Sequence, residues 1–273
     1  MLRLALRVQR EQAELVLAEL LELAPSGVEE SEPEPGIVEY AVYGAPGELP
    51  ALPELTAAAG GTGGALVEVR TEEIPDDWAV RWRSFHRPLV LDGLTIRPPW
   101  EPPATTPVDV VIDPGQAFGT GAHATTRLCL ELLLDAPGPC GTLIDVGCGS
   151  GVLAIVAARL GWEPVRALDY DPAAVTATRE NAAANDVTLE VFEFDLRADQ
   201  VPDCELAVAN VLAAPLRVWA ATQHRFPPEV ILSGLLVEEA DSVATAFAAR
   251  GGVEQERRHR GEWSALRLQF PSA

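Results

Sequence analysis

A glycine-rich turn holds the residues of this chain that are best spaced for chemistry. Gly147, Gly149 and Gly151 recur at alternate positions between an apolar run at 143–146 and a second apolar run that predicts a helix over 150–160. Glycines let the backbone bend sharply and let a ligand lie directly against the main chain. The new helix adds unpaired N–H groups and the positive end of its dipole. The pattern predicts a nucleotide site at the carboxyl end of the first parallel strand.

Two acidic residues indicate which kind of nucleotide this site would bind. Asp145 precedes the turn, and Asp169 ends the next apolar run, where its carboxylate can accept hydrogen bonds from both hydroxyls of a ribose. A dinucleotide site would need a glycine where this chain has Val152, so a nicotinamide oxidoreductase is disfavoured. The turn and the acids together resemble the S-adenosylmethionine site of class I methyltransferases. The alternative is an ordinary tight turn with an unrelated acid downstream.

A third candidate group lies at a later strand end. Asn210 follows the apolar run 205–209, and its side-chain carbonyl can accept a hydrogen bond from an amine and direct the lone pair of the nitrogen. No aromatic ring follows in Asn210-Val211-Leu212-Ala213, which disfavours a nucleobase as the methyl acceptor. Asp195 can accept from the amine of adenine. For Asn210 and Asp195 alike, an ordinary turn residue is the alternative, and the sequence offers no convincing general base.

The stretch 113–126 is long, irregular and rich in glycine and small polar residues. Loops of this kind tend to be functional. It lies just upstream of the first strand of the predicted sheet, so we expect it to fold over the ligand, with Phe118 covering an apolar or sulfonium region and Thr120 and Thr126 donating hydroxyl groups. Thr125 or Thr126 is expected to cap the helix that follows. Gly119 and Gly121 are further predicted cofactor contacts. The alternative is that this stretch is a loop with a structural role only.

Alternating strand and helix patterns surround the glycine turn and predict a doubly wound α/β sheet. Asp171-Pro172 provides a helix cap and a first-turn proline. We expect seven strands that end in a hairpin, with the last strand antiparallel. The strands are predicted at 143–146, 164–168, 188–192, 205–209, 229–232, 253–258 and 263–269, and the helices at 126–134, 150–160, 171–184, 213–222 and 237–250.

The amino-terminal part has a different pattern, which predicts a small ferredoxin-like α+β domain over residues 1–72. Up to Arg70 it holds 12 glutamates and 4 arginines, so it either docks a basic protein or has a solvated acidic face. A helical linker is predicted over 73–95 and a catalytic domain over 96–273. The strand patterns are 2–8, 28–32, 37–43, 65–69 and 108–112, with short strands near 90–96, and the helix patterns are 10–23, 50–59 and 74–87.

Composition limits the partners of the protein. The formal net charge is −21, which argues against a nucleic-acid surface and favours basic partners, although solubility alone also explains it. No apolar run approaches the length of a membrane span and no cleavable leader is evident, so we expect a cytoplasmic monomer without membrane contact. The spacing of the four cysteines predicts reduced thiols and no metal site.

Longer motifs give the sequence a specific resemblance. It is similar to the PrmA family of bacterial methyltransferases, which modify ribosomal protein eleven of the large subunit. The resemblance implies S-adenosylmethionine contacts at Thr126, Gly147, Asp169 and Asn210, a small domain that recognises the ribosomal protein, and trimethylation of lysine ε-amines and the α-amine. The loop departs from the usual pattern at Ala122 and Ala124. The motifs are 113–126, 145–155, 169–172 and 209–216.

These observations predict an S-adenosylmethionine-dependent amine methyltransferase that acts on a ribosomal protein, with Asn210 facing the methyl group. A second hypothesis is methylation of another protein or of a small-molecule amine, because the substrate domain is the less specific part of the resemblance. A third hypothesis, from another functional class, is a catalytically silent adaptor that binds the cofactor without turnover.

Overall fold

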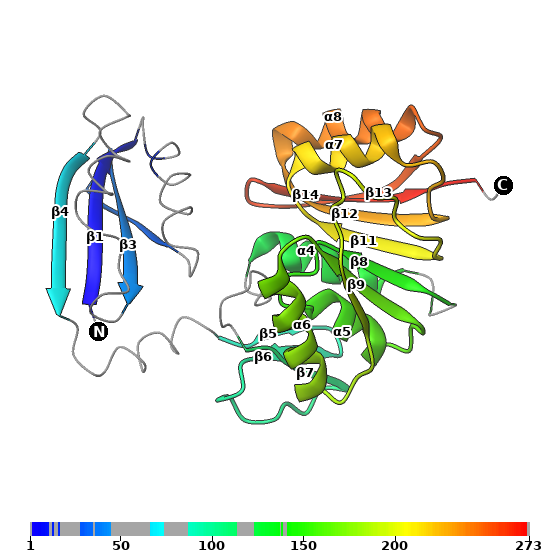
Figure 1. Cartoon of the computed structure of the whole chain (residues 1–273), viewed down its shortest axis with the longest axis horizontal. Coiled ribbons are helices and arrows are strands. Elements are labelled where there is room, and N and C mark those ends of the chain that lie inside the picture. The colour runs from blue at the N-terminus through cyan, green and yellow to red at the C-terminus, as the bar shows by residue number, and fades with distance from the viewer. Residues whose placement is uncertain are drawn as a thin grey trace. The chain divides into compact units, whose positions relative to one another are not determined.

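The computed structural model describes most of the chain as two compact units, Met1–Phe85 and His86–Ala273 (Figure 1). The domain boundaries expected from the sequence stay predictions, because residues 74–86 lie outside the described residues. The helix predicted over 50–59, most of the helix predicted over 10–23 and most of that over 74–87 also lie outside them. The described residues are 2–10, 13, 16, 28–34, 36–44, 66–73, 87–113, 123–136, 138 and 141–271.

The smaller unit contains a four-stranded antiparallel sheet in the order β2-β3-β1-β4. Its core combines apolar side chains of the central strands with Ala13 and Val16, and the hydroxyl of Tyr40 donates to the carbonyl of Ala13 at 3.1 Å. All six residues of the edge strand β2 are exposed, and four of them are glutamates. The strands are β1 (Leu2–Gln9), β2 (Glu29–Glu34), β3 (Ile37–Gly44) and β4 (Leu66–Glu73).

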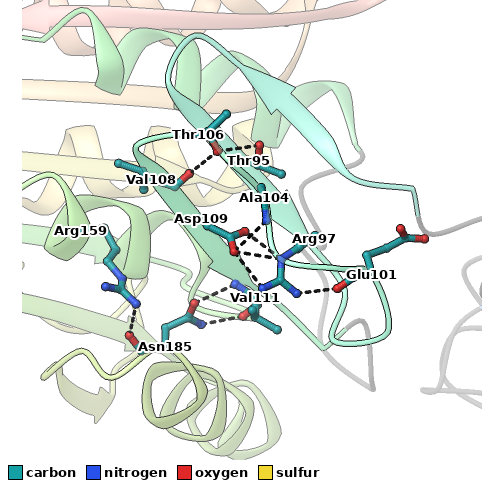
Figure 2. A network of polar contacts seen from close by, with 10 residues as sticks. All are labelled: Thr95, Arg97, Glu101, Ala104, Thr106, Val108, Asp109, Val111, Arg159 and Asn185. Carbon is teal, nitrogen blue, oxygen red and sulfur yellow. Dashed lines mark hydrogen bonds and ion pairs between the residues drawn. The ribbon is translucent and has the colours of Figure 1, made fainter.

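The larger unit begins with a three-stranded sheet, β5 (Leu89–Leu91), β6 (Leu94–Arg97) and β7 (Val108–Val111). The strands β6 and β7 are parallel, and the loop between them is fixed by Arg97. Its guanidinium donates to both carboxylate oxygens of Asp109 at 2.9 Å and to the carbonyl of Glu101 at 2.7 Å (Figure 2). This network holds β7 in place ahead of the stretch 113–126.

A seven-stranded sheet forms the centre of the larger unit, in the order β10-β9-β8-β11-β12-β14-β13. The five strands from β8 to β12 are parallel to one another. The last strand, β14, lies between β12 and β13 and is antiparallel to both. The mostly parallel α/β sheet predicted from the sequence is thereby confirmed. The strands are β8 (Leu143–Val146), β9 (Val165–Asp169), β10 (Glu190–Glu193), β11 (Leu206–Asn210), β12 (Glu229–Leu236), β13 (Val253–Arg260) and β14 (Trp263–Gln269).

Helices cover both faces of this sheet (Figure 1). One apolar cluster packs α4 (Ala124–Leu134), α5 (Val152–Arg159) and α6 (Pro172–Ala184) against the sheet, and the other packs α7 (Ala213–Thr222) and α8 (Val237–Ala248) against the opposite face. Residues 152–157 of α5 are all buried, as expected for a helix that is apolar nearly all round. Within the described part of the chain, every helix is too short or too polar to cross a bilayer.

The start of α4 corrects the sequence prediction. Thr125 and Thr126 were the expected caps, and this expectation is wrong because the helix begins at Ala124 with His123 as its N-cap. The ring nitrogen Nδ1 of His123 accepts from the backbone N–H of Thr125 at 3.3 Å, which is the bond that a serine or threonine cap would make. Both threonines are therefore placed in the first turn, where their side chains are buried.

Candidate active site

Strand register brings the predicted site residues to one edge of the central sheet. Val146 at the end of β8 pairs with Leu168 of β9 on one side and with Ala209 of β11 on the other. Neighbouring strands lie about 4.8 Å apart, so the residues that follow this row lie close together. They are Gly147, Asp169 and Asn210, at the carboxyl edge where β8 separates the two halves of the sheet.

The turn after β8 requires glycine at three positions. Gly147, Gly149 and Gly151 have φ angles of 75°, 54° and 80°, a region that other residues adopt only with strain. A Cβ on Gly147 would lie 2.3 Å from Cγ1 of Val211, and one on Gly151 would lie 2.8 Å from Cγ2 of Thr178. The side chains of Val211 and Thr178 thus fill the space beside two of these glycines, and the use of the turn as a ligand surface stays a prediction.

Asp169 is held beside this turn by two backbone donors. The N–H of Gly149 donates to its Oδ2 at 2.9 Å, and the N–H of Asp171 donates to its Oδ1 at 3.0 Å. A carboxylate oxygen has room for about two hydrogen bonds, so each oxygen retains capacity for one more donor. Two acceptor positions on one carboxylate match the two hydroxyls of a ribose.

Asp145 lies beneath the turn and is fully buried. Its Oδ2 accepts from the backbone N–H of Ala154 at 3.1 Å in the first turn of α5. Among the described residues no donor reaches its Oδ1. Burial raises the pKa of this carboxyl to about 7, and the charge of Asp169 adds to the effect. In this arrangement Asp145 supports the turn from inside, while its contact with a cofactor stays a prediction.

Asn210 is oriented by Thr126 in the first turn of α4. Its side-chain Nδ2 donates to Oγ1 of Thr126 at 3.2 Å, which leaves the carbonyl Oδ1 as an acceptor. The hydroxyl of Ser233, the residue paired with Asn210 in β12, donates to the carbonyl of Thr125 at 3.0 Å. Thr126 was predicted from its type to donate to the cofactor. The structure gives it this second task of fixing the amide of Asn210, and the cofactor contact stays a prediction.

Val211 fixes the backbone on which Asn210 lies. Its side chain packs on Gly147, and its N–H donates to the carbonyl of Ser233 at 3.2 Å. Gly234 has a φ of 83°, and a Cβ there would lie 2.5 Å from the carbonyl oxygen of Val211. Val211 is therefore enclosed between Gly147 in the turn after β8 and Gly234 in β12. Sequence reasoning missed this contact, because glycines at 147 and 234 reveal it only once the strand order is known.

Two exposed apolar side chains at this edge were also missed. Tyr170 directly follows Asp169 and is 70% exposed, and Leu212 follows Val211 and is 67% exposed. Large apolar residues at strand ends next to predicted ligand groups are the signal that points to them. Arg197 lies over the Tyr170 ring, with its Cζ 5.6 Å from the ring centroid, and its guanidinium also binds the carboxylate of Asp195. Hydrogen bonds from the side chain and from the backbone N–H of Arg197 hold the pKa of Asp195 below its usual value.

The remaining predicted residues fall outside the part of the chain that the structure describes. These are the loop residues Phe118, Gly119, Thr120 and Gly121, so their cofactor contacts stay predictions. The adenine contact predicted for Asp195 also stays a prediction, because that carboxylate is described only with Arg197. The three described cysteines, Cys129, Cys148 and Cys204, are free and buried.

The model of the family "Ribosomal protein L11 methyltransferase (PrmA)" matches residues 50–271. The chain belongs to the PrmA family. A relative named ribosomal protein L11 methyltransferase from Geobacter metallireducens is 44% identical over 200 residues, which cover 71% of this chain and 66% of the relative. One of the same name from Psychrobacter sp. is 42% identical, over 63% of this chain and 60% of the relative.

A solved structure agrees with this assignment. The ribosomal protein L11 methylase from Lactobacillus delbrueckii subsp. bulgaricus is 30% identical, with a TM-score of 0.62, and the match covers 68% of this chain and 100% of that chain. PrmA membership confirms the resemblance drawn from the four sequence motifs, and the larger unit has the α/β fold of a methyltransferase. The matched region spans about two thirds or less of the length of the first two curated relatives.

Proposed function

We propose that this protein transfers methyl groups from S-adenosylmethionine to amines of ribosomal protein L11 in the cytoplasm, and that it trimethylates lysine ε-amines and the α-amine. Membership of the PrmA family supports the reaction and the substrate. The observation that carries the proposal is the meeting of Gly147, Asp169 and Asn210 at one edge of the sheet, in the register described above.

The residues present fit the cofactor. Bare backbone at 147–151 receives the nucleoside, and the open acceptor positions of Asp169 bind the ribose hydroxyls. When bound, S-adenosylmethionine supplies an electrophilic methyl group on a sulfonium that leaves as a neutral thioether. We assign the loop residues 118–121 to the cover of this ligand. Asp145 supports the turn that binds it.

Asn210 orients the amine. A lysine amine has a pKa of about 10.4 and must be neutral to attack, and removal from water near a positive charge lowers that pKa. The Oδ1 of Asn210 accepts from an amine N–H and directs the nitrogen lone pair, because Thr126 occupies the opposite end of the amide. Most of the rate enhancement then comes from alignment of the nitrogen with the methyl group.

The smaller unit is the proposed substrate-recognition domain. Its strand order, β2-β3-β1-β4, is the order of a ferredoxin-like sheet, which supports that assignment. The exposed glutamates of β2 favour a basic protein as partner. We propose that the protein acts as a monomer without direct contact to nucleic acid.

Purified protein, labelled S-adenosylmethionine and the ribosomal protein test this function. Label on the ribosomal protein, with mass increases that correspond to three methyl groups per modified amine, is the expected result. Label that appears only on other components of a cell extract would favour a different protein or a small-molecule amine as acceptor. Cofactor binding without any label transfer would favour an adaptor.

A further inference from the structure

One side chain of α6 joins the glycine turn to the start of the stretch 113–126. The Nδ2 of Asn181 donates to the carbonyl of Ser150 at 2.9 Å, and its Oδ1 accepts from the N–H of Asp113 at 3.1 Å. Asn181 and Ser150 are both buried. Both ends of the amide are therefore used, one in the turn and one at the end of β7.

A second asparagine, Asn185, is the C-cap of α6 and also binds the main chain near the end of β7, but it makes no hydrogen bond to the glycine turn. The Oδ1 of Asn185 accepts from the N–H of Val111 at 2.8 Å, and its Nδ2 donates to the carbonyl of Val111 at 2.6 Å (Figure 2). Asn181 and Asn185 lie on one helix face, since they are four residues apart. They bind alternate residues of β7 and its extension, as a neighbouring strand would.

A third residue of α6 shows that this helix controls the shape of the turn. The hydroxyl of Thr178 donates to the carbonyl of Gly149 at 3.0 Å, and its methyl group packs where a Cβ on Gly151 would lie. Thr178 and Asn181 thus hold two successive carbonyls of the turn, at Gly149 and Ser150. In the same turn, the N–H of Gly149 donates to Oδ2 of Asp169.

We propose that Asn181 is a positioning residue of the cofactor site. It holds the glycine turn and Asp113 at a fixed separation, and Asp113 begins the stretch whose other end, at Thr126, orients Asn210. Cofactor affinity consequently depends on the amide of Asn181, whereas the side chain of Asn185 binds the backbone of Val111 and the carbonyl of Asn181 and makes no hydrogen bond to the turn. This inference rests on the proposed function, because it concerns the binding of the same cofactor.

The two asparagines provide a matched test. Asn181→Asp and Asn185→Asp each replace a buried donor by an acceptor on the same helix, and both face a backbone carbonyl. The dissociation constant for S-adenosylmethionine is measured by calorimetry, and thermal unfolding is followed by circular dichroism. We expect about a tenfold weaker cofactor affinity for Asn181→Asp and a change within about twofold for Asn185→Asp, with similar losses of melting temperature.

Uncharged variants keep the test decisive if a buried aspartate prevents folding. Asn181→Ala and Asn185→Ala remove the same hydrogen bonds without adding charge, and the same difference in affinity is expected. For Asn181→Ala the Michaelis constant for the cofactor should rise, while kcat at saturating cofactor changes less. Equal affinities in the two variants would overturn the positioning role. A wild-type protein that does not bind S-adenosylmethionine would instead overturn the proposed function.

Discussion

The two flanks of β8 hold their hydrogen-bond acceptors in different ways. On the β9 side, the carboxylate of Asp169 is fixed by two backbone N–H groups, and the turn beside it contains three glycines. On the β11 side, the carbonyl of Asn210 is fixed by one side-chain hydroxyl, and its backbone is fixed by the packing of Val211. If the proposed function is right, binding of the cofactor depends on backbone shape, whereas orientation of the amine depends on side chains that single substitutions can alter selectively.

Gly147→Ala should have the largest effect, because this glycine belongs to both flanks. The added Cβ would lie 2.3 Å from Val211 in a backbone conformation with φ of 75°. Strain and overpacking of this kind cost a few kcal/mol, so we expect cofactor affinity to fall at least about 100-fold, together with methyl transfer. Calorimetry and an activity assay measure the two losses.

Gly93→Ala is the control for this substitution. Gly93 has a φ of 70°, and no atom lies within 4 Å of a Cβ built there. Gly93→Ala therefore introduces backbone strain without a steric clash, and the cofactor affinity of this variant should remain unchanged. If Gly147→Ala lost no more affinity than Gly93→Ala, the contact between Val211 and the turn would not matter.

Asp169→Asn should affect the β9 flank alone. The amide has one acceptor oxygen in place of two, so one backbone N–H loses its partner and one ribose hydroxyl loses its acceptor. We expect about 30-fold weaker cofactor affinity, as for the loss of a charge-assisted hydrogen bond. Asp171→Asn is the matched control, since asparagine also serves as the cap that Asp171 provides to α6. Equal affinities in both variants would contradict the role of Asp169.

Thr126→Val should affect the β11 flank alone. Removal of the hydroxyl leaves the Asn210 amide free to rotate, so kcat should fall about tenfold, by a larger factor than the cofactor affinity falls. Thr125→Val is the matched control, because it makes the same change at the neighbouring buried position. The hydroxyl of Thr125 contacts His123 and not Asn210, so kcat of this variant should be unchanged. A fall in cofactor affinity with unchanged kcat would place Thr126 on the cofactor side instead.

Asp145→Asn should have the smallest effect on cofactor affinity and methyl transfer, and it tests how stability depends on pH. Burial raises the pKa of Asp145 in the folded protein to about 7, above the value of about 3.9 that an aspartate has in an unfolded chain, so between these values the native state binds more protons than the unfolded state. This group therefore makes the wild type less stable as pH rises from about 4 to 7, and above that range its effect on stability no longer changes with pH. The difference in melting temperature, variant minus wild type, should rise across that window, and a constant difference would contradict the raised pKa.

Much of this site follows from the sequence because local rules specify it. The glycines at 147, 149 and 151 and the acid at 169 predict a strand, a turn and an acceptor from their spacing alone, and Asp171-Pro172 starts α6 at the expected residue. The cap of α4 did not follow, since a histidine is an uncommon cap and two threonines competed for the role. The contacts of Asn181 and Val211 did not follow either. Asp113, a partner of Asn181, is 68 residues away, and the partners of Val211 lie in the turn after β8 and in β12.

The packing of Val211 between two glycines limits which positions can be changed to alter the proposed amine substrate. Any larger residue at 147 or 234 collides with Val211, so these three positions can change only in concert. Leu212, one residue further on, is 67% exposed and carries no such restriction. Libraries that aim to admit bulkier amines should therefore vary Leu212 first and leave its predecessor intact.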